Sequence, residues 1–170
     1  MTKKKKDAKR QEALARKSAA QSLDFLTMWG LKQLGYDEGC IWQTHAKTEL
    51  KYINELGLTE DLLMLKQFVD KVKHELGCGV VVGVGDFTQS IVCLALSISK
   101  IEDFEKVEIP TKTWEGLFAQ KVLAIYYPES IRNEVVSWAR TNGFNMSTYL
   151  GQPILKLNHL FILIKREKGV

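Results

Sequence analysis

The sequence has few of the features that mark a secreted or membrane protein. Its three cysteines, Cys40, Cys78 and Cys93, are an odd number with no CxxC pair, which disfavours a disulfide framework and fits a reducing compartment. It lacks an uninterrupted apolar run of about 18 residues, and no apolar segment of the signal-peptide type follows the basic start. We therefore expect a cytoplasmic protein that does not enter a membrane.

Linkers and repeats are also missing. The chain contains only three prolines, and no internal repeat or stretch rich in proline, glycine and serine divides it. At 170 residues and 45% hydrophobic content it is large enough to bury roughly 70% of its unfolded surface without a disulfide, metal or cofactor. We predict a single domain over residues 18–170, preceded by an arm over residues 1–17.

The arm, residues 1–17, carries an excess of positive charge. The net charge is +4, but residues 1–17 carry eight basic side chains against Asp7 and Glu12, so the arm is +6 and the remainder is −2. The basic residues of the arm are Lys3, Lys4, Lys5, Lys6, Lys9, Arg10, Arg16 and Lys17. A smaller basic cluster, Lys165, Arg166 and Lys168, lies near the C-terminus. We expect a flexible basic arm that attracts phosphates, or alternatively one that only confers solubility.

The first half of the body has helical periodicity. A helix-favouring stretch runs from about Asp7 to Leu34, with an apolar stripe only in its later part. Thr44 is a candidate cap for a second helix that stops at Leu56-Gly57. A third helix is predicted from Thr59 to Leu76, because Leu62, Leu65, Val69, Val72 and Leu76 are spaced three, four, three and four residues apart.

The second half is predicted to be rich in strands. β-branched and apolar runs predict strands at residues 80–84, 90–98, 106–109 and 121–127, with a hairpin turn at 85–88. A helical turn is predicted at 113–120, and a helix opened by Pro128 and stopped at Gly143. Leu160 to Ile164 suits a central strand. The predicted fold class is α+β: N-terminal helices followed by a mostly antiparallel sheet crossed by one helix.

The sequence contains only weak motifs for phosphate binding, metal binding or catalysis. The GxG in "VGVGDF" precedes another predicted strand rather than a helix, so it indicates a turn and not a phosphate loop. Cys40, His45, His74 and Cys78 could converge on zinc, but their spacing matches no common zinc site, and we predict no metal. The carboxylates Asp86, Glu102, Asp103 and Glu105 could serve a small metal-dependent hydrolase. A binding protein is favoured over an enzyme.

Residues 121–150 combine a strand (121–127), Pro128, a helix with apolar Ile131, Val135 and Ala139, the pair Asn142-Gly143, and a second helix start at 145–150. This arrangement resembles the ribbon-helix-helix DNA-binding family. The resemblance implies that two chains pair this strand into a ribbon that enters the major groove. The alternative, which we expect, is that the strand pairs within its own sheet beside Leu160 to Ile164.

These observations favour a non-enzymatic, nucleic-acid-associated accessory protein whose arm contacts phosphates. Tyr36, Trp42 and Tyr126 are candidates for stacking on unpaired bases. The alternative is a protein-interaction or assembly module, with a protein partner or a second copy of the chain and a solubilising arm. A small hydrolase is the third possibility.

Overall fold

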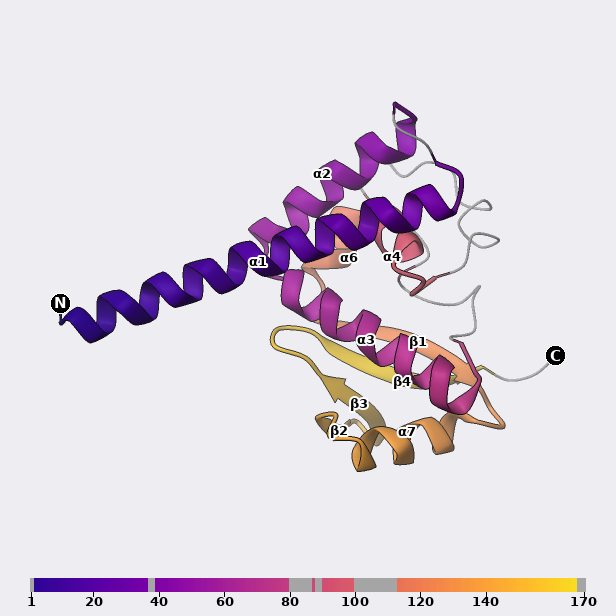
Figure 1. Cartoon of the computed structure of the whole chain (residues 1–170). Coiled ribbons are helices and arrows are strands. Elements are labelled where there is room, and N and C mark those ends of the chain that lie inside the picture. Colours follow the sequence, from indigo (N-terminus) through magenta and orange to yellow (C-terminus); the bar gives the residue numbers. More distant parts are fainter. Residues whose placement is uncertain (1, 37–38, 80–86, 88–89, 100–112, 168–170) are drawn as a thin grey trace.

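A computed structural model of the chain describes residues 2–36, 39–79, 87, 90–99 and 113–167 (Figure 1). The fold is α+β, with helices first and a four-stranded sheet at the end, as predicted. The helices are α1 (Lys3–Gln33), α2 (Ile41–Glu55), α3 (Thr59–Leu76), α4 (Ile91–Ala95), α6 (Thr113–Ala119) and α7 (Arg132–Thr141). The strands are β1 (Val122–Pro128), β2 (Met146–Tyr149), β3 (Gln152–Lys156) and β4 (Phe161–Glu167).

Helix α3 has the predicted bounds, and its sequence explains both of its ends. Glu60 and Asp61 lie in its first turn and Lys73 in its last, and these charges complement the helix dipole. Gly77 closes it in the left-handed conformation, with φ of 68°. Leu62, Leu65, Val69 and Val72 of its apolar stripe are buried in the main core, as the periodicity predicts, and Leu76 is partly buried against it.

The sheet has the order β1-β4-β3-β2, so the segment Leu160 to Ile164 does supply a central strand. β1 and β4 are parallel, with Leu123 beside Ile162 and Ile125 beside Ile164. The β4–β3 and β3–β2 pairs are antiparallel. Two of the three pairings are therefore antiparallel, and the prediction that 121–127 pairs within its own chain is confirmed.

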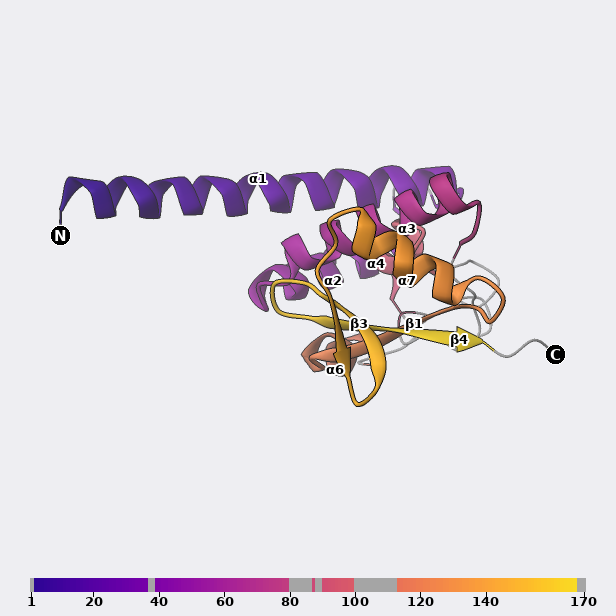
Figure 2. The ribbon, with the colours of Figure 1, turned by 90° about the horizontal axis from the view of Figure 1, so that it is seen from below.

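Helices α3 and α7 lie together on one side of the sheet (Figures 1 and 2). An aromatic cluster joins them: the ring centroid of Phe68 in α3 is 6.3 Å from that of Trp138 in α7 and 5.1 Å from that of Phe144. The Trp138 indole also donates to Glu75 Oε2 at 2.8 Å. These contacts attach the helical half of the chain to the sheet half.

The predicted strand at 90–98 is wrong. Residues 91–95 form α4 instead, and Ser90 caps it by accepting a hydrogen bond from the Cys93 N–H. Ile91, Val92, Cys93, Leu94 and Ala95 are all buried. A helix buried on every side has no polar face, so its sequence looks like that of a covered strand.

Three local boundaries also differ from the predictions. Pro128 is the last residue of β1 rather than the first of the following helix, which begins at Arg132. Helix α2 begins at Ile41, before the predicted cap Thr44. Residues 146–149 form strand β2 where the ribbon-helix-helix resemblance implies a second helix, and Leu150 and Gly151 turn the chain into β3 with positive φ angles of 48° and 77°. The strand-helix geometry therefore departs from that family's pattern.

Some predicted features lie outside the described residues. These are the strands at 80–84 and 106–109, the turn at 85–88 apart from Phe87, the carboxylates Asp86, Glu102, Asp103 and Glu105, and Lys168.

Candidate functional site

Helix α1 is the most distinctive feature of the molecule. It spans 31 residues, about 46 Å at the α-helical rise. Its C-terminal half packs on the body through Leu23, Thr27, Gly30 and Leu31, which are buried. The N-terminal half extends past every other element into solvent (Figures 1 and 2). Residues 3–17 are thus the start of one continuous helix, and we keep the name arm for them.

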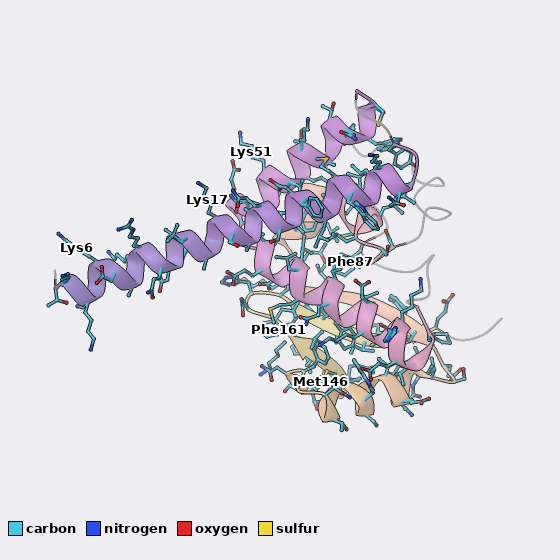
Figure 3. The ribbon with its side chains drawn as sticks, in the orientation of Figure 1. Lys6, Lys17, Lys51, Phe87, Met146 and Phe161 are labelled. Atoms are coloured by element: carbon cyan, nitrogen blue, oxygen red, sulfur yellow. The ribbon has the colours of Figure 1, made fainter. Side chains whose placement is uncertain are left out.

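All eight predicted phosphate-binding residues lie on this projecting part of α1. Every residue from Lys3 to Lys17 is exposed. Lys6 lies far out along the helix and Lys17 where the helix reaches the body (Figure 3). The ion pair found among the described residues is Lys66–Asp70 on α3, so the basic residues of the arm are not neutralised by described carboxylates.

The positive charge surrounds the arm instead of forming one stripe. Successive helical residues are rotated by about 100°, so the four residues Lys3 to Lys6 point in four different directions. The first turn has no acidic residue, and Thr2 makes no capping hydrogen bond through its side chain. Unpaired N–H groups and the positive end of the helix dipole add to the lysine charge. This end of the molecule attracts anions from any side.

A hollow of about 410 Å³ lies at the base of the arm. Arg16 and Ala19 line one side, and the end of α2, the start of α3 and His159 line the other. Glu55 and Glu60 are among these residues, so the hollow has mixed charge. It therefore does not continue the basic surface of the arm.

Two large apolar side chains stand on the outward face of α1. Phe25 and Trp29, one helical turn apart, are 68% and 56% exposed. The buried residues of α1, which begin at Leu23, lie on the opposite face. Exposed aromatic residues paired in this way are typical of a helix that docks a partner, although single exposed apolar residues are common on protein surfaces.

Glu49 is a buried charged residue that the sequence reasoning missed. Its carboxylate, 2% exposed, accepts hydrogen bonds from the Ser90 hydroxyl at 2.8 Å and from the Ile91 and Val92 N–H groups at 3.1 Å each. Burial raises the pKa of Glu49 to about 7, although these three hydrogen bonds oppose the shift. The sequence does indicate this burial, because Glu49 falls on the same helical stripe as Ala46, Leu50 and Ile53, which are buried.

The candidate zinc ligands are not brought together. Cys40 and His45 lie at the start of α2, whereas His74 and Cys78 lie at the end of α3. Within the described part of the chain, no three His, Cys, Asp or Glu residues are grouped so that they could hold a metal ion. Cys93 is buried beside Glu49, and its burial raises the pKa of the thiol.

The aromatic residues proposed for base stacking have structural contacts instead. Tyr36 and Trp42 lie with their ring centroids 6.1 Å apart and pack against a small second core. That core consists of Leu31, Ala46, Ile91, Leu94 and Ala95. Tyr126 is half-buried on β1.

No protein-family model matches this chain, and no curated protein is significantly similar to it. Across the described residues, no helix combines the length and the apolar content that crossing a membrane requires.

Proposed function

We propose that this chain is a non-enzymatic, nucleic-acid-associated accessory protein of the cytoplasm that binds phosphate backbones with its arm. One observation carries the proposal: eight basic side chains lie exposed on a helical segment that projects from the body, without described carboxylate partners. Each lysine or arginine that neutralises a backbone phosphate releases a condensed counterion, which drives binding. The remainder of the chain carries a net charge of −2, so its overall charge does not attract a polyanion.

The layout of the charge favours binding without sequence specificity. Lysines on all sides of a helix can neutralise phosphates of either strand, but they carry little information about base identity. Residues 3–17 contain no asparagine, and Arg10, Gln11 and Arg16 are the arginine and glutamine side chains available there for base edges, beside six lysines. The proposal therefore predicts similar affinity for unrelated duplexes of equal length.

The test is a salt titration with a four-residue charge variant. With roughly four to six phosphate contacts, the slope of log K against log salt should be about −4 to −5 on duplex DNA. Replacing Lys3, Lys4, Lys5 and Lys6 by glutamine should reduce the slope by about one for each lost contact and weaken binding at low salt. Fluorescence anisotropy with a labelled duplex measures both quantities.

A matched control removes the same charge from the body. Lys51, Lys73, Lys121 and Lys156 are exposed and lie on four different segments. Changing these four to glutamine should leave the slope close to that of the unmodified protein. If the slope and the affinity at low salt decreased equally in the two variants, net charge alone, and not the arm, would determine affinity.

A second candidate function, a protein-interaction module, is favoured by Phe25 and Trp29. These rings lie on the part of α1 that the body already holds rigid, and they face solvent. In that case the arm serves only solubility, and the four-lysine variant would bind the same partner as the unmodified protein.

A further inference from the structure

The end of strand β4 and the start of helix α7 are fixed to each other. The Glu129 N–H donates to the Glu167 carbonyl oxygen at 3.1 Å. The Arg132 Nε donates to the Ile164 carbonyl oxygen at 2.9 Å, and Arg132 is only 8% exposed. The guanidinium of Arg132 is therefore held in one position by the backbone of the central strand.

A hollow of about 490 Å³ lies beside this guanidinium. It is lined by Arg132, Gly151, Gln152, Pro153, Lys165 and Arg166, and we call it the α7–β4 hollow. Among the described residues that line it, the three charged ones are all cations and none is a carboxylate. The hollow combines residues from the start of α7, the β2–β3 turn region and the end of β4, which are far apart in the sequence.

The two arginines of the hollow are held by neutral acceptors. Arg132 Nη1 and Arg166 Nη2 both donate to the side-chain oxygen of Asn133, each at 3.0 Å. Arg132 Nη2 donates to Gln152 Oε1 at 3.2 Å. A single amide oxygen thus joins two guanidinium groups, which satisfies donors but leaves both charges in place. Burial, together with the charge of Arg166, lowers the pKa of Arg132.

No carboxylate in the described part of the chain forms an ion pair with these cations. Glu134 lies exposed in the first turn of α7, and Oε2 of Glu167 is buried without a hydrogen-bond partner among the described residues. The described ion pair, Lys66–Asp70, is on α3. Holding like charges close together costs free energy that a bound anion would recover.

We propose that the α7–β4 hollow binds a phosphate group. Guanidinium groups present paired N–H donors that match the oxygens of phosphate, and a lysine adds a point charge. Of the five N–H groups on Arg132, three are engaged by the described acceptors, so two remain for a ligand. Three cations favour a doubly charged phosphate over a singly charged carboxylate, and the volume admits a phosphate with an attached group.

This site is separate from the arm. The N-terminus of α1 and the end of β4 lie at opposite ends of the molecule in both views (Figures 1 and 2). Phosphate binding in the hollow therefore does not depend on the proposed function of the arm. The phosphate could belong to a small phosphorylated molecule or to the end of a nucleic acid strand.

Thermal unfolding with inorganic phosphate tests the site in the full chain. At fixed ionic strength, replacing chloride by phosphate should raise the Tm of the unmodified protein, because a ligand of the folded state stabilises it. Arg166→Gln should weaken phosphate affinity about tenfold or more, and Lys165→Gln should weaken it less. Arg166 is exposed, so this change should leave the fold intact.

Two controls make the result specific. Lys156 is exposed at the end of β3, so Lys156→Gln removes one positive charge outside the hollow and should keep the full response. The variant with Lys3 to Lys6 changed to glutamine should also keep it, even if that variant loses duplex binding. Equal stabilisation by phosphate and chloride, or an undiminished response in Arg166→Gln, would overturn the proposal.

Two further probes identify the source of the phosphate. Tighter binding of a nucleoside monophosphate than of inorganic phosphate, lost in Arg166→Gln, would point to a small phosphorylated molecule. Tighter binding of an oligonucleotide with a 5′-phosphate than of the same oligonucleotide without it, again lost in Arg166→Gln, would point to a strand end.

Discussion

Glu49 is a buried ionisable residue, and the hydrogen-bond donors to its carboxylate are all neutral. Its carboxylate receives one hydroxyl and two backbone N–H groups from the start of α4. The same residue therefore joins α2 to α4 and caps a five-residue helix that is too short to be stable alone. Its protonation state is coupled to folding because burial opposes its charge.

The pH dependence of stability should reveal this coupling. The pKa of Glu49 is about 7 in the folded chain against an ordinary value of 4.5, so the folded state binds more protons between these values. The contribution of Glu49 to the free energy of unfolding should be fully present below pH 4.5 and fall as pH rises to 7, by about 3 kcal/mol in total. Urea unfolding of the unmodified protein and of Glu49→Gln at several pH values measures the difference.

Glu55→Gln is the control for this experiment. Glu55 ends the same helix and is exposed, so its replacement should leave the pH dependence unchanged. The explanation fails if Glu49→Gln retains the same pH dependence as the unmodified protein.

At the scale of elements, α3 and α4 show what a sequence does and does not reveal. α3 has one buried face and one solvated face, so the spacing of Leu62, Leu65 and Val69 predicts it to the residue. α4 is buried on all sides, and nothing in its five residues distinguishes a helix from a strand. The difference lies in the surroundings of each element, which a local pattern cannot contain.

The same limit applies to the candidate sites. The arm was predictable because its eight charges are close in sequence and need no fold to bring them together. The α7–β4 hollow is not predictable in this way, although Lys165 and Arg166 belong to the basic cluster that the sequence shows near the C-terminus. Arg132 is separated from them by more than thirty residues, and only the β1–α7 connection places it at the end of β4.

Two helical glycines give a paired test of the packing between elements. A Cβ atom at Gly30 in α1 would overlap the backbone carbonyl of Ala95, where α1 crosses α4. Gly30→Ala should therefore destabilise the fold by about 3 kcal/mol, since backbone must move. Gly116→Ala in α6 adds the same methyl group to open space and should stabilise by about 0.5–1 kcal/mol. Chemical denaturation measures both, and equal effects would show that the α1–α4 contact is looser than described.

At the scale of the whole molecule, the net positive charge lies in the arm and not in the body. The arm holds +6 while the rest of the chain holds −2. The helical form of the arm is disfavoured by the arm's own charges. Four lysines lie at the positive end of the helix dipole, and Lys5–Lys9 and Lys6–Arg10 are like-charge pairs one turn apart. An isolated helix of this length is marginal in water, so the arm depends on the anchored half of α1.

A bound polyanion should therefore increase the helical order of the arm. Phosphates placed around the lysines remove their mutual repulsion and bind the free N–H groups of the first turn. Hydrogen exchange followed by mass spectrometry should show slower exchange of amides 5–17 when duplex is added, with little change in peptides from residues 23–33, which already pack on the body. The variant with glutamine at positions 3–6 should gain much less protection. Unchanged exchange in the arm at saturating duplex would mean that the phosphates are bound elsewhere, and the α7–β4 hollow would then be the first place to look for them.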